Sequence, residues 1–333
     1  MGMISYILKR LVYIAIVLLA FATLNFFIFM YIPQAVLGLG VQFFVPPHAA
    51  GQNETLLYAQ VANQFGFNQP WPTRYWLYIV NVFSGNYGVG ITSISGHKPV
   101  WTLISTYAPN SIFLLGVSSI LAIILGALVG VISAARREKF VDLASVSAGV
   151  FSFSLPSFWI GLLLLYVFSV ANHWFPVGLG SATAAAAPGL LPYIQAYLWA
   201  STLPIISLTL ISWGGFLLIM RNTVNDVLTE DYITMARAKG LSERTVLYRH
   251  AFRNALLPLV TSIALTFGFI LSGAVITETI FSFTGLGWAS LQYIYAFDYP
   301  VIMGLFFLIG VMVIAANFIS DIVYGFLDPR VTY

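Results

Sequence analysis

The chain has 333 residues, of which 59% are hydrophobic and only 8% are charged. Because ordinary soluble domains carry about 25% charged residues, this composition excludes a soluble domain and indicates an integral membrane protein. The net charge of +3 and the lack of cysteine argue against a nucleic-acid-binding surface and against thiol or disulfide chemistry.

Six apolar stretches are long enough to cross a bilayer as helices, so an all-α polytopic membrane protein is expected. The expected order is a cytoplasmic N-terminus 1–10, span 11–32, external segment 33–107, spans 108–132 and 143–170, external loop 171–200, span 201–220, cytoplasmic loop 221–255, span 256–278, external loop 279–300, span 301–326 and cytoplasmic tail 327–333. No small-residue cleavage site follows the first stretch, which therefore indicates a retained span and not a signal peptide.

The external segment is rich in Pro and Gly, and short helices are expected in it near 54–65 and 72–83. The second span begins with Pro109, which a first helical turn tolerates. Gly126 and Gly130 in the same span form a G-x-x-x-G pattern, which permits another helix to approach closely.

The third and fifth spans carry small and hydroxylated residues. In the third span, Ser152 and Ser154 precede Pro156, which predicts a kink. In the fifth span, Gly268 and Ser272 mark a small-residue face. Such faces pack against neighbouring helices, and the alternative interpretation is that these five residues line a polar translocation path.

The charge-rich loop 221–255 is the most informative stretch, because 10 of the 25 charged residues lie between Arg221 and Arg253. At roughly 2.5–3.5 kcal/mol per charge, burying this stretch at the bilayer centre would cost tens of kcal/mol. The loop must therefore lie in water.

The loop's pattern predicts two short helices joined at a glycine. Thr229 is the expected N-cap of the first helix, with Asp231 in the opening turn. Gly240 fits the left-handed position that ends this helix, and Ser242 is the expected N-cap of the second. The alternatives are a solvated helical loop or a docking element for a soluble partner.

The second helix has one face formed by Val246, Leu247, His250 and Ala251, with Arg249 and Arg253 displaced to another. After the fifth span, the carboxylates of Glu278 and Asp298 are expected to be hydrated in an external loop.

The distribution of basic residues tests this topology independently. Of the 14 Lys and Arg residues, 12 fall on the expected cytoplasmic side: Lys9, Arg10, Arg136, Arg137, Lys139, Arg221, Arg237, Lys239, Arg244, Arg249, Arg253 and Arg330. Only Arg74 and Lys98 fall outside, in a long segment where the bias is weaker.

The stretch Ala236-Arg237-Ala238-Lys239-Gly240-Leu241-Ser242, followed by His250, Arg253 and Pro258, closely resembles the EAA-type loop of ABC importer permeases in its dipeptide and oligopeptide version. Thr234-Met235-Ala236 stands in place of the general Glu-Ala-Ala, and Arg253 stands where many sugar and amino-acid permeases have proline. Further similarity runs through Leu155–Gly161, Thr277–Gly287 and Asp328–Arg330. Asn86 departs from it, because aspartate is common at that position.

This resemblance implies a type I importer permease fold in the cell membrane and a B-type permease subunit for peptides. It implies that Asp231, Ala236–Ser242, His250, Arg253 and Pro258 couple the chain to an ATPase. The implied partners are a second, homologous permease subunit in a heterodimer, two ABC ATPases and an extracytoplasmic substrate-binding protein. The alternative is that the same machinery imports oligosaccharides or nickel.

No cofactor is expected on this chain, since it lacks a G-x-x-x-x-G-K-[ST] phosphate-binding loop and ATP would be bound by the partner subunits. An ion-coupled secondary transporter would need ionisable residues near mid-membrane, and the expected spans have none in their central thirds. A membrane hydrolase would need clustered catalytic or metal-binding residues, whereas the four histidines are scattered.

Overall fold

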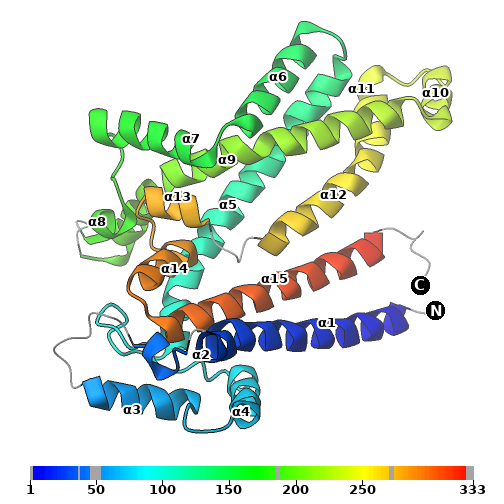
Figure 1. Ribbon diagram of the computed structural model, residues 1–333. Helices are drawn as coiled ribbons and strands as arrows, with labels where there is room; N and C mark the ends of the chain where they lie inside the picture. Colours follow the sequence, from blue (N-terminus) through cyan, green and yellow to red (C-terminus); the bar gives the residue numbers. More distant parts are fainter. Residues whose placement is uncertain (1–2, 37, 46–53, 185–187, 270–273, 328–333) are drawn as a thin grey trace.

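The computed structural model describes residues 3–36, 38–45, 54–184, 188–269 and 274–327. These residues are helical apart from turns, loops and an isolated antiparallel bridge between Val89 and Pro99 (Figure 1). The expected all-α class is therefore confirmed.

The N-terminal half contains α1 (Met3–Phe26), η1 (Phe27–Tyr31), α2 (Ile32–Ala35), η2 (Val41–Phe43), α3 (Glu54–Phe65), α4 (Trp71–Phe83), α5 (Val100–Ala135) and α6 (Phe140–Ser154). The C-terminal half contains α7 (Ser157–Leu164), η3 (Leu165–Ala171), α8 (Leu179–Ala184), α9 (Leu190–Leu228), α10 (Asp231–Ala238), α11 (Glu243–Thr245), η4 (Val246–Ala251), α12 (Phe252–Phe269), α13 (Val275–Ile280), α14 (Leu286–Tyr295) and α15 (Tyr299–Leu327). The two short helices expected in the external segment are present as α3 and α4.

Within the described residues, four helices are long and apolar enough to cross a membrane, namely Ile7–Ala35, Val100–Ala135, Leu190–Leu228 and Tyr299–Ile319. A fifth span arises if α6 and the helix Ser157–Ala171 are counted as one broken span bent by 96°. The break falls at Leu155 and Pro156, which confirms the kink expected there. The expected six spans are compatible with this count, although it does not reproduce them all.

Several helices depart from the expected boundaries. The helix α5 begins at Val100, not at 108, so Pro109 lies inside it and not in its first turn. The helix α9 covers Leu190–Leu228 where a span 201–220 was expected. Both helices are longer than expected because residues on either side of the apolar stretch are also helical. Hydropathy locates only the apolar stretch itself.

Close packing of α5 against α9 forms the centre of the fold (Figure 1). A Cβ atom added to Gly126 would lie 2.5 Å from the Trp213 carbonyl oxygen, and one added to Gly130 would lie 2.7 Å from the Leu217 carbonyl oxygen. The backbones can come this close only because neither glycine has a side chain. The close approach expected from the G-x-x-x-G pattern is confirmed.

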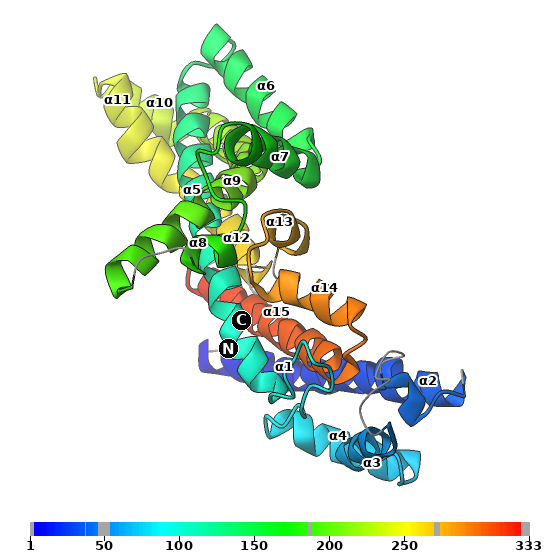
Figure 2. The same cartoon turned by 90° about the vertical axis from the view of Figure 1, so that its left-hand side faces the viewer.

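A second hydrophobic core is formed by α1, α15, α3 and α4. The helices α1 and α15 lie side by side in both views (Figures 1 and 2). Phe26 of α1 packs against Tyr75 and Tyr78 of α4, and the Tyr78 hydroxyl donates a 3.0 Å hydrogen bond to Asn25 Oδ1. These contacts fix α4 to the C-terminal part of α1.

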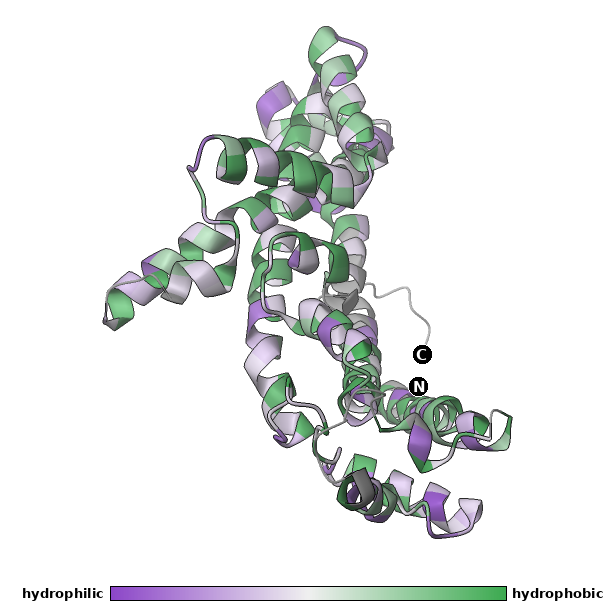
Figure 3. Cartoon of the chain, turned by 60° about the vertical axis from the view of Figure 1, so that its left-hand side comes forward, coloured by the Kyte–Doolittle hydropathy of each residue, from purple (hydrophilic) through white to green (hydrophobic). Residues whose placement is uncertain are grey.

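Hydrophobic residues predominate along the long helices, as the hydropathy colouring shows (Figure 3), and many of their large side chains are exposed. Ile16, Leu128 and Phe151 are each more than half exposed. Exposing such a surface to water is unfavourable, whereas contact with lipid or with a second subunit carries no such free-energy cost. The chain is a multi-pass membrane protein.

Candidate coupling site

The segment that follows α9 folds into a compact knob made of α10, α11 and η4 (Figure 1). Its first cap differs from expectation, because Thr229 is the C-cap of α9 and its hydroxyl donates to the Asp226 carbonyl at 2.7 Å. Glu230 precedes α10 as N-cap without a side-chain hydrogen bond. Thr229 was mispredicted because α9 continues eight residues beyond the expected end of its span, at 220.

The helix α10 packs one face onto η4. Ile233 and Ala236 of α10 are buried against Val246 and Ala251, and Val227 and Leu228 at the end of α9 pack on the same cluster. Asp231 lies in the first turn of α10 and Arg237 in its last turn, as expected from the helix dipole. This small core holds α10 at a defined angle to the end of α9.

The turn after α10 is built on Gly240. This residue has φ +78°, and its N–H donates to the Arg237 carbonyl at 2.9 Å. The left-handed conformation expected for Gly240 is confirmed, and no atom lies within 4 Å of the position of a Cβ atom there. The requirement for glycine is therefore one of backbone conformation and not of space.

Ser242 caps the next helix, as expected. The Ser242 Oγ accepts a 3.3 Å hydrogen bond from the Thr245 N–H, and α11 then leads directly into the π-helical turn η4. Val246 and Ala251 are fully buried, while Arg249 and Arg253 are exposed, so the two expected faces are confirmed. The π-helix itself has no signal in the sequence pattern.

The hinge is bridged by a pair of charged side chains on either side of Gly240. Arg237 donates from Nε and Nη2 to the two carboxylate oxygens of Glu243, at 2.9 and 3.3 Å. Because both side chains are largely exposed, the pair contributes little stability, but its bidentate geometry orients α11 relative to α10.

The outward face of the knob has an apolar character that the motif alone does not indicate. Tyr232, Met235 and Leu241 are exposed there, beside the exposed Ala238 and Lys239. Exposed apolar side chains in a charged loop are typical of a surface that another protein covers. Tyr232 and Met235 are absent from the sequence-based set of coupling residues.

Two members of the predicted coupling set lie apart from the knob's tip. His250 is half buried in η4, and Pro258 lies inside α12. Pro258 was expected in the first turn of a span beginning at 256, but α12 already begins at Phe252. The structure therefore brings Asp231 and the stretch 236–242 together and leaves Pro258 further along the chain.

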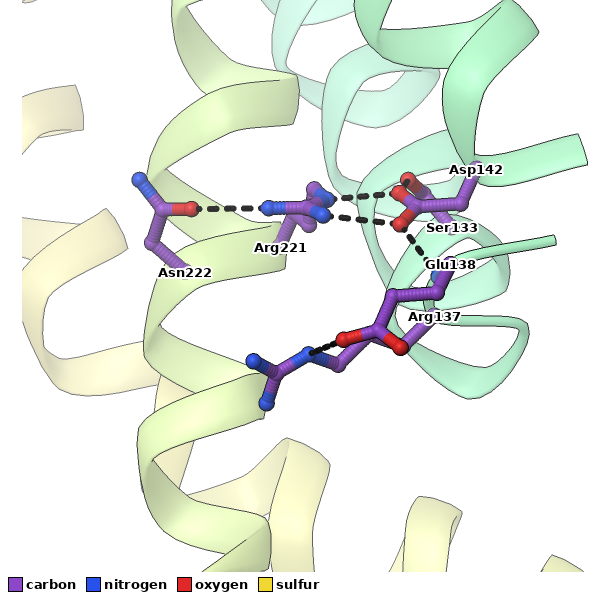
Figure 4. A network of polar contacts seen from close by, with 6 residues as sticks. All are labelled: Ser133, Arg137, Glu138, Asp142, Arg221 and Asn222. Atoms are coloured by element: carbon purple, nitrogen blue, oxygen red, sulfur yellow. Dashed lines mark hydrogen bonds and ion pairs between the residues drawn. The ribbon is translucent and has the colours of Figure 1, made fainter.

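A polar network that sequence reasoning missed ties the third span to α9 (Figure 4). Arg221 of α9 donates from Nε and Nη2 to the two oxygens of the Asp142 carboxylate, at 2.6 and 2.7 Å. The Ser133 hydroxyl and the Glu138 N–H donate to the same carboxylate, at 2.5 and 2.9 Å. Asp142 is almost fully buried, and these four donors satisfy it.

This polar network joins the helices at the end of the molecule where the knob is attached. Ser133 is near the end of α5, Asp142 is in the first turn of α6, and Arg221 is on the helix that ends beside α10. One carboxylate thus joins three long helices at the end where the knob is attached. In the sequence, the only hint was an acidic residue three positions after the basic turn 136–139.

A translocation path remains a prediction for the five residues considered for it, of which Ser152, Ser154 and Pro156 lie at the end of α6 and in the break after it. The Ser152 and Ser154 hydroxyls donate to carbonyls of their own helix, at Gly149 and Val150. Pro156 is exposed at the kink, Gly268 lies near the end of α12, and Ser272 falls outside the described residues.

Glu278 and Asp298 are both fully buried, which corrects the expectation of hydrated loop carboxylates. Glu278 accepts hydrogen bonds from the Ser111 hydroxyl and from the N–H groups of Ala274 and Trp288. Asp298 accepts from the Ile91 N–H and from both the N–H and the hydroxyl of Thr92. Protein donors replace hydration at each carboxylate, so Glu278 joins α13 to α5 through Ser111, and Asp298 joins the start of α15 to residues 91–92.

Two family models together match most of the chain. The model of the binding-protein-dependent transport system inner membrane component matches residues 122–333, and the model of its N-terminal region matches residues 3–112. The chain is 33% identical to the oligopeptide transport system permease protein AppB of Bacillus subtilis over 331 residues, covering 99% of this chain and 100% of that protein.

Other comparisons agree. The glutathione transport system permease protein GsiC of Salmonella typhimurium is 32% identical over 332 residues, covering 99% of this chain and 100% of GsiC. A chain of the MetNI methionine ABC transporter, solved in an inward-facing conformation, has the same fold with a TM-score of 0.53 and 17% identity, covering 68% of this chain and 97% of that one. The protein therefore belongs to the inner membrane components of binding-protein-dependent transport systems.

Proposed function

We propose that this chain is a permease subunit of an ATP-driven ABC importer for peptides. The observation that carries the proposal is the knob of α10, Gly240 and α11, which presents an exposed apolar tip on a small core that packs against the end of a continuous 39-residue helix. Such a tip suits a groove on a soluble partner, and α9 suits the transmission of movement from it.

In the proposed mechanism, nucleotide binding closes two ATPase subunits and moves the knob with the groove that holds it. The helix α9 then tilts as a rigid element. Arg221 is hydrogen-bonded to Asp142, and Gly126 and Gly130 allow α5 to pack closely on α9. The helices α5 and α6 therefore follow this tilt, and the path opens to the other side of the membrane.

The remaining parts of the machine are proposed as follows. A second, homologous permease subunit completes the path, an extracytoplasmic binding protein delivers the peptide, and ATP hydrolysis takes place in the ATPase subunits. Both termini and the knob lie in the cytoplasm, which the placement of Lys and Arg supports. The peptide substrate is supported by the names of the full-length relatives.

The test is reconstitution of the complete transporter in vesicles with a radiolabelled oligopeptide and the binding protein. We expect uptake that requires ATP, both ATPase subunits and the binding protein, with no uptake by this chain alone. Accumulation of peptide against its gradient by the isolated chain would disprove the proposal, and uptake of an oligosaccharide or of nickel in place of peptide would disprove the substrate.

A further inference from the structure

A hollow of about 550 Å³ lies behind the knob, between the ends of α5 and α9 on one side and α10, α11 and η4 on the other. Its polar lining includes Arg137, Asn225, Arg237, Glu243, Arg244 and Tyr248. A second hollow of about 400 Å³ shares Arg244 and Tyr248 and adds Arg249. None of the exposed apolar residues at the tip of α10 lines either hollow.

The charges of the larger hollow do not cancel. Arg237 donates two hydrogen bonds to the Glu243 carboxylate, so the negative charge of Glu243 is already paired. Among the described residues, the ion-pair partner of Arg137 is its neighbour Glu138, at 3.4 Å, in a pair that is largely exposed and therefore weak. Within the described part of the chain, Arg244 has no ion-pair partner. Arg137 and Arg244 thus leave an excess of positive charge around the hollow.

Apart from Leu247 of η4, the apolar residues of the lining lie at the ends of α5 and α9. Ala134 and Ala135 are the last residues of α5, and Leu228 is the last residue of α9. The charged turn 136–139 begins immediately afterwards. Ala134 and Ala135 follow the expected end of their span, at 132, by two and three residues, and at such a depth a bilayer presents its glycerol and phosphate groups.

We propose that this hollow binds the phosphate of an anionic phospholipid, held between Arg137 at the end of α5 and Arg244 on α11. Guanidinium groups match the geometry of phosphate oxygens, and the alanines and leucine accommodate the glycerol and the first methylene groups. An ATPase covering the tip would approach from the face with Tyr232 and Met235, whereas a lipid reaches the hollow from the bilayer. The choice of leaflet rests on the proposed cytoplasmic position of the knob.

A bound lipid would bridge the turn after α5 to the second half of the knob. The hinge at Gly240 would then be braced from α5 as well as from α9, so coupling would depend on the lipid charge. Phosphatidylglycerol is a suitable probe, and phosphatidylcholine is the matched lipid without net charge.

The experiment uses the complete transporter in nanodiscs of phosphatidylcholine with a small fraction of spin-labelled phosphatidylglycerol. The double variant R137Q/R244Q is compared with R136Q/K139Q, which removes the same number of positive charges, both of them from the turn after α5 and from positions that do not line the hollow. We expect R137Q/R244Q to retain the immobilised lipid at least about tenfold more weakly, and R136Q/K139Q to retain it like the unmodified protein.

Equal losses in the two variants would overturn the proposal, because they would indicate general attraction to the charged surface. Displacement of the lipid by millimolar inorganic phosphate would assign the hollow to free phosphate instead. Immobilisation that appears only when the ATPase subunits are removed would assign it to an acidic side chain of the ATPase. None of these readouts depends on which substrate is transported.

Discussion

Gly240 shows how one residue can be required for its backbone conformation alone. With φ +78° and open space around the Cβ position, a Cβ atom would meet no neighbour, but valine would strain the turn by roughly 1–2 kcal/mol. We expect G240V to reduce peptide-stimulated ATP hydrolysis and uptake strongly while membrane insertion is unchanged.

The matched variant is G240N, because asparagine tolerates the left-handed conformation far better than valine does. We expect G240N to retain most of the coupled activity, measured as ATP hydrolysed with and without the loaded binding protein. If G240V and G240N behave alike, the left-handed turn is not what coupling requires.

Arg74 of α4 is a buried cation. It is 1% exposed, its guanidinium lies 4.8 Å from the centre of the Phe67 ring and 5.9 Å from that of Phe26, and its three side-chain nitrogens have no hydrogen-bond partner among the described residues. Burial lowers the pKa of this group from its usual value. The two aromatic rings offset only part of the desolvation cost.

We therefore expect R74M to stabilise the chain by roughly 1–3 kcal/mol, since it removes an unsatisfied charge and keeps the volume of the stem. The measurement is the thermal unfolding of the purified chain in one detergent, with R74Q as a polar comparison. A lower unfolding temperature for R74M than for the unmodified chain would contradict this account of Arg74.

At the scale of elements, the joint between α6 and α9 depends on two side chains that are 79 positions apart. Removing one partner of such a buried pair leaves the other uncompensated and costs roughly 3 kcal/mol or more. We expect D142N and R221Q to destabilise the protein individually, and the double variant D142N/R221Q to cost much less than the sum of the two.

The double-mutant cycle is measured by denaturation, and the ratio of uptake to ATP hydrolysis is measured in parallel. The proposed transmission predicts that this ratio falls in each single variant, because α6 no longer follows α9. Additive stability effects, or an unchanged ratio in the single variants, would show that the network does not link the two helices.

At the scale of the whole molecule, the proposed orientation can be tested directly because the chain contains no cysteine. Lys239 in the knob and Asn68 between α3 and α4 are both exposed. We expect K239C to react with a membrane-impermeant maleimide only after cells are opened, and N68C to react in intact cells. The reverse pattern would invert the topology and remove the knob from contact with any cytoplasmic ATPase.

The sequence alone determined what depends on neighbouring residues: the apolar stretches, the hydrated charged loop, the left-handed Gly240, the Ser242 cap and the kink at Pro156. It indicated the contact face of α5 as well, because a small-residue pattern has meaning within one helix. It misjudged Thr229 and Pro258, because helix ends depend on how far the helix continues beyond its apolar window.

Only the tertiary structure decided what depends on residues far apart in the chain. Glu278 meets Ser111 across 167 positions, and Asp298 meets Ile91 across 207, so no local pattern could distinguish these carboxylates from hydrated ones. The same holds for Asp142 with Arg221. A buried charge is stable only where folding brings donors around it, and that arrangement belongs to the packed helices and not to any single stretch of sequence.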